Sequence, residues 1–226
     1  IKLEMLELVH RYQVKLEDEK IVRREERARM KEIENAEKEM AKSLKDIDKD
    51  ITHHRNEINK LTKYLNNTDL PAEKELYIEK IKELDASLIK LNEEKEVVKD
   101  RKENAQSGYV YIISNIGSFG EDVYKIGVTR RLEPMDRINE LSSASVPFEF
   151  DVHALIFSER AFDLEKALHQ HFSDKKINKV NNRKEFFKLD LNELKNKVLQ
   201  EHNNTVQFID EPKATQYKES LRLNFE

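Results

Sequence analysis

Hydrophobic positions recur at helical spacing through the first half of the chain. Residues 33–65 carry apolar side chains at alternating steps of four and three, and a second series of this kind spans residues 77–98. Such spacing is typical of a helix that packs along one seam. Residues 66–71 between the two series are turn formers that end in Pro71, which suits the first turn of a new helix. The pattern predicts a long antiparallel helical hairpin that packs as a coiled coil.

A few seam positions of this hairpin are charged or polar. Glu37, His54 and Lys95 interrupt the apolar series, as register-setting residues do in coiled coils. Pairing within the chain is the simplest interpretation, and a homodimer or a partner protein held by the hairpin is an alternative. The alternation of Lys and Arg with Glu and Asp through residues 23–39 is interpreted as a solvated face.

After about residue 107 the hydrophobic period changes from that of helices to that of strands. Residues 109–113 and 123–128 are β-branched and aromatic, and a loop with Gly117 and Gly120 joins them, which predicts a β-hairpin. A helix is expected from Glu133, with its apolar side formed by Met135, Ile138 and Leu141. Arg137 should therefore turn away from this apolar side, toward the edge of the sheet.

The remaining pattern predicts one more strand, a short strand candidate and two more helices. Residues 148–154 alternate strictly, which places Phe148, Phe150 and Val152 on one face of a third strand. Glu165 and His169 lie four positions apart, beside an apolar helical stripe formed by Ala161, Leu164, Leu168 and Phe172. Residues 184–189 are a short strand candidate, and Asp190 is a cap for a last helix that ends near His202.

These elements predict an α+β protein in two parts. A helical hairpin over residues 1–106 precedes a small α/β domain over residues 107–202, in which helices flank a three-stranded antiparallel sheet, and residues 203–226 form a tail. Composition agrees with this division, because all ten Phe and all four Gly lie after Ser107. The absence of Cys leaves only oxygen and nitrogen ligands for a metal and suits the cytoplasm.

Net charge and hydropathy limit the kinds of partner that the chain can bind. The formal net charge of -4 argues against tight non-specific binding of nucleic acid but leaves room for a local cationic cleft. No stretch of this sequence is apolar enough to span a membrane. Because the chain begins at Ile1 in a helical pattern, we expect a fragment, so membrane association through an upstream segment remains open.

Several motifs of the second half follow one another in a familiar order. Tyr109-Val110-Tyr111 precedes Tyr124-Lys125-Ile126-Gly127, Arg137 and Glu165 lie on the two helices that follow, and residues 183–187 close the series. In this order they resemble the GIY-YIG nuclease superfamily, and the phage-type branch fits best. Residues 12–27 resemble, less specifically, the helical end of a domain that is often fused to such modules. The resemblance covers less than half of the chain.

The resemblance implies a metal-dependent endonuclease with Tyr111, Lys125, Arg137 and Glu165 as catalytic residues. One Mg²⁺ or Mn²⁺ ion is expected on Glu165, since Mg²⁺ keeps several waters and needs few protein ligands. Arg137 suits a phosphate oxygen. Tyr111 takes a proton from the attacking water or orients it, while Lys125 shares the base role through a lowered pKa or binds phosphate. Possible supporting residues are Tyr109, His169 and Glu185.

DNA is the expected substrate, and the fusion resemblance makes phage DNA and antiviral defence plausible. Nucleic-acid-binding roles are expected for Arg130, Arg131, Arg183 and Lys184. Three alternatives stay open. The domain is a catalytically silent nucleic-acid-binding module on a coiled-coil scaffold, or Glu165 and His169 are two ligands of a transition metal. In the third, the nuclease is held inactive until a partner or a membrane event releases it.

Overall fold

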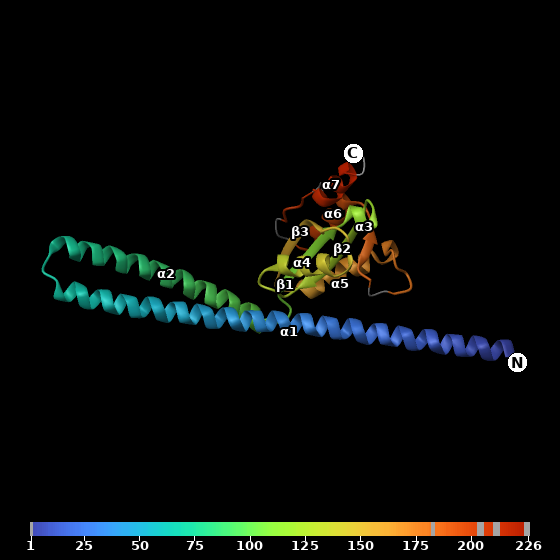
Figure 1. Ribbon diagram of the computed structural model, residues 1–226, viewed down its shortest axis with the longest axis horizontal. Helices are drawn as coiled ribbons and strands as arrows, with labels where there is room; N and C mark the ends of the chain where they lie inside the picture. The colour runs from blue at the N-terminus through green and yellow to red at the C-terminus, as the bar shows by residue number, and fades with distance from the viewer. Residues whose placement is uncertain (1, 182–183, 203–205, 210–212, 224–226) are drawn as a thin grey trace.

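The predicted helical hairpin is confirmed. The computed structural model describes residues 2–181, 184–202, 206–209 and 213–223. Helix α1 (Lys2–Asn67) turns back through a short connection into α2 (Pro71–Glu103), and the two helices run antiparallel (Figure 1). Pro71 stands at the start of α2, where its missing N–H costs no hydrogen bond. The hydroxyl of Thr68 donates to Glu73 Oε2 at 2.5 Å and closes the turn.

The seam between α1 and α2 is apolar and buried. Met40, Ile47 and Ile51 from α1 pack with Val98 from α2, and each such side chain contributes about 1.5–3 kcal/mol when fully buried. Lys95 reaches across the seam to the carboxylate of Asp48 at 2.7 Å. Hydrophobic pairing therefore holds the C-terminal half of α1 against α2.

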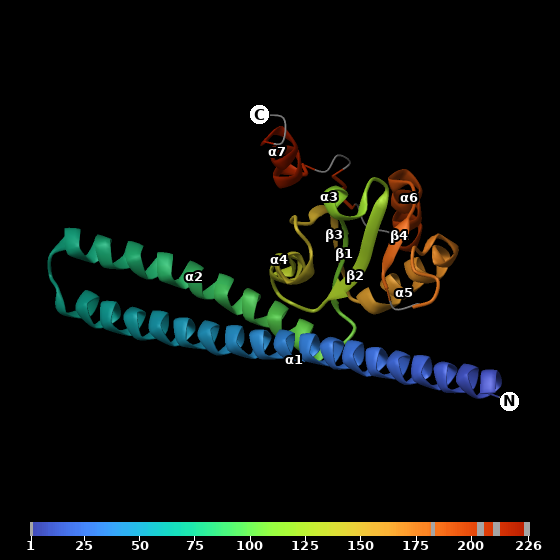
Figure 2. The same cartoon turned by 45° about the vertical axis from the view of Figure 1, so that its right-hand side comes forward.

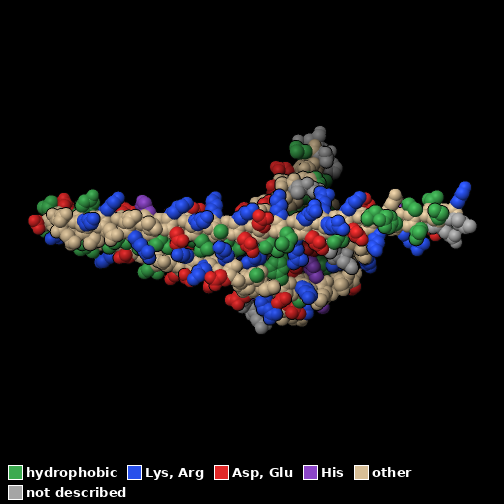
Figure 3. All heavy atoms as spheres, turned by 90° about the horizontal axis from the view of Figure 1, so that it is seen from below, with side chains coloured by type: hydrophobic (Ala, Val, Ile, Leu, Met, Phe, Trp, Pro, Cys, Tyr) green, Lys and Arg blue, Asp and Glu red, His purple; other side chains and the backbone are tan. Residues whose placement is uncertain are grey.

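The N-terminal half of α1 extends beyond the end of α2 (Figure 1). Its apolar side chains near the start of the helix are exposed, among them Leu3, Leu6 and Tyr12. Seen from the side of α1, hydrophobic side chains gather near this end, while charges of both signs intermix along the helix (Figure 3).

The second half of the chain forms a four-stranded antiparallel sheet with the order β3-β1-β2-β4. Its strands are β1 (Gly108–Ser114), β2 (Val123–Thr129), β3 (Asp151–Ser158) and β4 (Phe186–Lys188). The expectation of three strands is therefore wrong by one. The short β4 pairs with the start of β2, from Val123 to Lys125, so the strand candidate at residues 184–189 joins the sheet as an edge.

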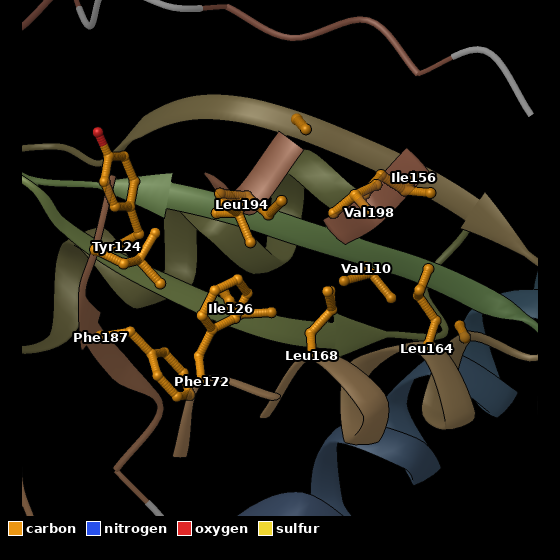
Figure 4. Packing of buried hydrophobic residues seen from close by; sticks show 14 residues of the cluster. Val110, Tyr124, Ile126, Ile156, Leu164, Leu168, Phe172, Phe187, Leu194 and Val198 are labelled. Carbon is orange, nitrogen blue, oxygen red and sulfur yellow. The ribbon is translucent and has the colours of Figure 1, made fainter. Parts of the chain in front are cut away.

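Helices α5 (Ala161–His171) and α6 (Leu191–Glu201) cover one face of this sheet. Val110 and Ile126 from the sheet pack there against Leu164, Leu168 and Leu194 (Figure 4). The apolar stripe predicted for α5 is confirmed, because its four members are at most 6% exposed. This stripe fixes the rotation of α5 and so the direction in which its polar residues point.

Helix α4 (Pro134–Ser145) covers the opposite face. Ile138 is buried against Tyr111 and Ile113, and Leu141 packs on the same cluster. Met135 was expected on this apolar side, but it is 40% exposed. It lies in the first turn of α4, one residue after Pro134.

The third strand lies further along the chain than its alternation predicts. It begins at Asp151, so Phe148 and Phe150 precede it. Phe150 still packs on the α4 side of the sheet, whereas the ring of Phe148 meets that of Tyr217, with their centroids 5.5 Å apart. Tyr217 belongs to α7 (Thr215–Leu223), a helix within the stretch expected to be a tail.

The remaining short elements complete the domain. A turn of helix, α3 (Ile116–Phe119), joins β1 to β2, and a 3-10 turn, η1 (Ser173–Lys175), follows α5. The predicted cap of α6 is confirmed, because the Asp190 side chain accepts from the backbone N–H groups of Asn192 and Glu193. Within the described ranges, no helix combines the length and the apolar character that crossing a membrane requires.

The sheet domain packs against the middle of α1 (Figure 2). Leu132, in the connection between β2 and α4, packs on the hairpin core beside Ala36 and Met40. The guanidinium of Arg101 at the end of α2 donates to the carbonyl of Arg131 at 2.8 Å. These contacts hold one side of the domain against the long helix.

Candidate active site

The register of the first two strands places the predicted motifs side by side. Tyr111 on β1 is opposite Gly127 on β2, and Ile113 is opposite Lys125. Side chains alternate between the faces of a strand, so Tyr111, Lys125 and Gly127 share one face. Gly127 leaves space there for the phenol ring, because a Cβ at this position would lie 2.6 Å from Cζ of Tyr111.

The charged groups predicted from the sequence lie near enough to Tyr111 for their charges to act on its phenol. This side chain is 3% exposed, and burial raises the pKa of its phenol above the ordinary value. The charges that also act on the phenol belong to Lys125, Glu185, Arg137 and Glu165. All four residues assigned a catalytic role therefore lie close to one point. The raised pKa favours an orienting role for Tyr111 over that of a proton acceptor.

Lys125 is paired with Glu185. Its Nζ lies 2.5 Å from Glu185 Oε2, and the lysine side chain is only 12% exposed. Burial by itself lowers the pKa of Lys125, but the neighbouring Tyr111 and Glu185 outweigh burial and raise it. The ammonium form is thus maintained at neutral pH, which favours phosphate binding over sharing the role of base. The ion pair with Lys125 also places Glu185 in direct contact with the cluster.

Arg137 extends from α4 toward the same cluster. Its Nη1 lies 3.4 Å from Glu140 Oε2 on its own helix and 3.7 Å from Glu32 Oε2 on α1. Its Nε is buried and makes no hydrogen bond with any group that the structure describes. Arg137 therefore keeps one inward-facing donor for a ligand.

Glu165 is the buried carboxylate of the cluster. It lies on α5 beside Leu164 and is 9% exposed. Burial raises the pKa of Glu165 to about 7, and the negative charge of Glu185 adds to this effect. The cations Arg29, Lys125 and Lys176 oppose it.

The two other supporting candidates have local partners. His169 Nε2 lies 2.9 Å from the carbonyl oxygen of Ile126, so this nitrogen carries the proton and donates. Burial lowers the pKa of His169 and the hydrogen bond only partly opposes it, which favours the neutral imidazole at neutral pH. Tyr109 lies at the other end of β1, where Arg101 is stacked 5.0 Å above its ring.

Three of the four residues predicted to bind nucleic acid contact acidic residues of α1. Arg131 pairs with Glu32 at 3.0 Å and Lys184 with Glu25 at 3.4 Å. Arg130 is buried; one of its nitrogens lies 3.4 Å from Glu37, and another donates to backbone carbonyls at the end of α2. Arg183 lies outside the described residues.

The first half of the chain therefore contributes to the surroundings of the site, which the sequence interpretation missed. The charge alternation over residues 23–39 predicts a solvated face, but Glu25, Glu32 and Glu39 all contact the sheet domain. Arg29 stacks 5.6 Å above the ring of Phe162 and acts on Glu165 through its charge. The signal was present in the regular spacing of Glu25, Glu32 and Glu39, two helical turns apart on one face.

The donor set fits a hard divalent cation at Glu165. A carboxylate oxygen is the ligand type that Mg²⁺ and Mn²⁺ prefer. No hydrogen bond or ion pair engages the Glu165 carboxylate within the described part of the chain, although it is nearly buried. Over the same residues, no group of three or more His, Asp and Glu side chains is placed to share a metal ion.

Comparison with known proteins extends these observations to a family. Neither the curated proteins nor the solved structures contain a match to this chain. The second half is nevertheless similar to a phage-associated, nuclease-like domain family, because residues 108–201, less than half of the chain, match the family model described as the T5orf172 domain.

Proposed function

We propose that the sheet domain is a GIY-YIG-type endonuclease that hydrolyses phosphodiester bonds in DNA with the help of one divalent metal ion. The observation that carries this proposal is the cluster around Tyr111, whose phenol lies within the electrostatic influence of an ammonium, a guanidinium and a buried carboxylate. The match of residues 108–201 to a nuclease-like family supports it. A phage-associated family also favours a role in defence against phage DNA.

Each residue has a role that follows from its chemistry. Glu165 would hold Mg²⁺ or Mn²⁺, which supplies positive charge for the transition state and lowers the pKa of bound water. Tyr111, as a neutral phenol, orients the attacking water by its hydroxyl. Lys125 and Arg137 bind phosphate oxygens and stabilise the charge that builds up on them. Water adds to phosphorus, the ester P–O bond breaks, and the leaving oxygen takes up a proton.

Glu185 positions Lys125 in this scheme. Its carboxylate contacts Nζ directly, so it holds the ammonium in place and keeps it charged. When a phosphate approaches, the same ammonium has further N–H donors available for it. We therefore treat Glu185 as a positioning residue.

Incubation of the purified chain with supercoiled plasmid tests the proposal. Relaxed or linear product should form with Mg²⁺ or Mn²⁺ and not with a chelator. Glu165→Gln and Arg137→Ala should each lower the rate at least about 100-fold, the effect of removing one electrostatic contact to a transition state.

Matched controls separate these effects from general damage. Lys166→Ala changes the exposed neighbour of Glu165 on α5, and Arg160→Ala removes an arginine that is 79% exposed. Both controls should cut like the wild type. If the wild type shifts plasmid mobility but never cuts, the domain is the catalytically silent binding module and the proposal is wrong.

A further inference from the structure

Glu32 of α1 lies between two arginines of the sheet domain. Arg131 donates to it through a forked contact, from Nε to Oε1 at 3.2 Å and from Nη2 to Oε2 at 3.0 Å. Arg137 Nη1 lies 3.7 Å from the same Oε2. The Glu32 side chain is only 12% exposed. A single carboxylate thus engages two guanidinium groups in a largely buried position.

A carboxylate and a phosphate diester make the same kind of contact with arginine. Both present two oxygens to the parallel N–H groups of the guanidinium fork. Arg137 belongs to the proposed catalytic cluster, whereas Arg131 lies just beyond the end of β2. The two guanidinium groups therefore form an anion site beside the cluster. Glu32 fills the buried part of this site, and the more exposed Glu140 of α4 also contacts Arg131 at 2.8 Å and Arg137 at 3.4 Å.

Other side chains on this side of α1 also interact with the sheet domain. Glu25 pairs with Lys184, a residue expected to bind nucleic acid, and Arg29 lies near Glu165. These residues lie on the side of α1 that faces the domain, where the helix runs past α5 and the end of β2 (Figure 2). Glu25 and Glu32 thus present negative charge to cationic residues that DNA would need, whereas Arg29 adds a positive charge near Glu165.

We propose that Arg131 and Arg137 form a binding site for a backbone phosphate of DNA, and that Glu32 occupies this site as an internal competitor. The inference rests on the proposed function for its substrate class. DNA can contact both arginines only when the Glu32 carboxylate moves away from them. The folded chain therefore binds DNA less tightly than it would with this site open. Removal of the Glu32 charge should release the site without a change in the residues that do the chemistry.

Binding of a short fluorescent DNA duplex in the presence of chelator, measured by anisotropy, tests this inference without cleavage. Glu32→Gln should lower the Kd about tenfold or more, because a competing charge-assisted contact of this strength is lost. Glu39→Gln is the matched control. Glu39 lies two turns further along the same face, and among the described residues its side chain accepts a hydrogen bond only from the backbone N–H of Leu132. The Kd of the Glu39→Gln variant should therefore stay that of the wild type.

The outcomes separate this inference from the proposed function. Tighter binding by Glu32→Gln together with faster plasmid cleavage supports both. Tighter binding without any cleavage by either protein supports the phosphate site and overturns the nuclease. An unchanged Kd for Glu32→Gln overturns the phosphate site, while cleavage by the wild type still decides the nuclease separately.

A second variant protects the test against loss of folding. Glu32→Asp keeps the charge but withdraws the carboxylate by one methylene from the arginines. It should bind the duplex more tightly than the wild type, though less tightly than Glu32→Gln. If the glutamine variant does not fold, a Kd for Glu32→Asp equal to or above that of the wild type overturns the inference.

Discussion

The phenol ring of Tyr111 rests directly on the backbone of Gly127, across the pair of strands that builds the candidate active site. A Cβ at Gly127 would lie within 3 Å of the Tyr111 hydroxyl oxygen and of two atoms of this ring. The glycine of the second motif is therefore a steric requirement of the tyrosine of the first. Strand register connects the two motifs, since these residues are direct partners in the ladder.

Gly127→Ala should consequently displace Tyr111. We expect the free energy of unfolding to fall by about 1–3 kcal/mol, the usual cost of an added methyl group in a packed site, and plasmid cleavage to be lost. Urea unfolding measures the first effect. Tyr111→Phe removes the hydroxyl that the new methyl group meets, so the double variant should recover part of the lost stability. Additive losses would contradict this steric account.

The raised pKa of Glu165 predicts a pH-dependent stability. The native carboxyl keeps its proton up to about pH 7, whereas the ordinary value is 4.5. Between these values the folded chain binds more protons than the unfolded chain, so stability falls as pH rises through this window. The full loss is at most about 3 kcal/mol.

Urea unfolding with chelator at pH 4.5 and pH 8, the two sides of this window, measures the effect. Glu165→Gln should exceed the wild type in stability at the higher pH and match it at the lower. Glu159→Gln, an exposed carboxylate just before α5, should show the same pH dependence as the wild type. Equal curves for Glu165→Gln and the wild type would contradict the raised pKa.

Metal binding should strengthen with pH because the cation must displace the Glu165 proton. Below about pH 7 the affinity for Mn²⁺ should rise about tenfold for each pH unit. Glu185→Gln should move the midpoint of this dependence to lower pH, since the charge of Glu185 helps to raise the pKa of Glu165. Electron paramagnetic resonance of free Mn²⁺ reports the binding. A midpoint that stays fixed or rises would contradict this coupling.

Arg130 should contribute mainly to stability. Its buried guanidinium donates to the carbonyls of Arg101, Lys102 and Asn104 at the end of α2. Arg130→Met leaves these carbonyls and Glu37 without that partner, so we expect a loss of about 1–3 kcal/mol. The exposed Arg55 on the hairpin provides the control Arg55→Met, which should shift the urea midpoint little. A near-neutral Arg130→Met would contradict the structural role.

Much of the fold follows from local periodicity. The turn before Pro71, the stripe on α5 and the cap at Asp190 depend on residues close in sequence, and each is confirmed. The candidate catalytic set follows from motif order, and Lys125, Arg137 and Glu165 lie near enough to Tyr111 for their charges to act on its phenol. Their chemical roles remain predictions. The short-range sequence pattern is thus sufficient to predict a helix or strand wherever that element buries one of its faces.

The rest depends on contacts between distant residues. Glu32 lies 99 positions before Arg131, and charge alternation on a helix looks the same whether it faces water or another domain. The strand β4 is only three residues long, too short for its alternation to be separated from a loop. Met135 fits the helical stripe, yet in the first turn of α4 the sheet does not cover it.

Because α1 is one continuous helix, the direction in which Glu32 faces the candidate site is fixed relative to the face of α1 that packs in the hairpin. Glu32 faces the two arginines, while Ala36 and Met40, further along the same helix, are packed in the hairpin core. Each residue added between Glu32 and Ala36 would turn one against the other by about 100°. A one-residue insertion there would aim Glu32 away from the arginines, whereas an insertion of about one full turn would restore its direction but move it about 5.4 Å along the helix axis.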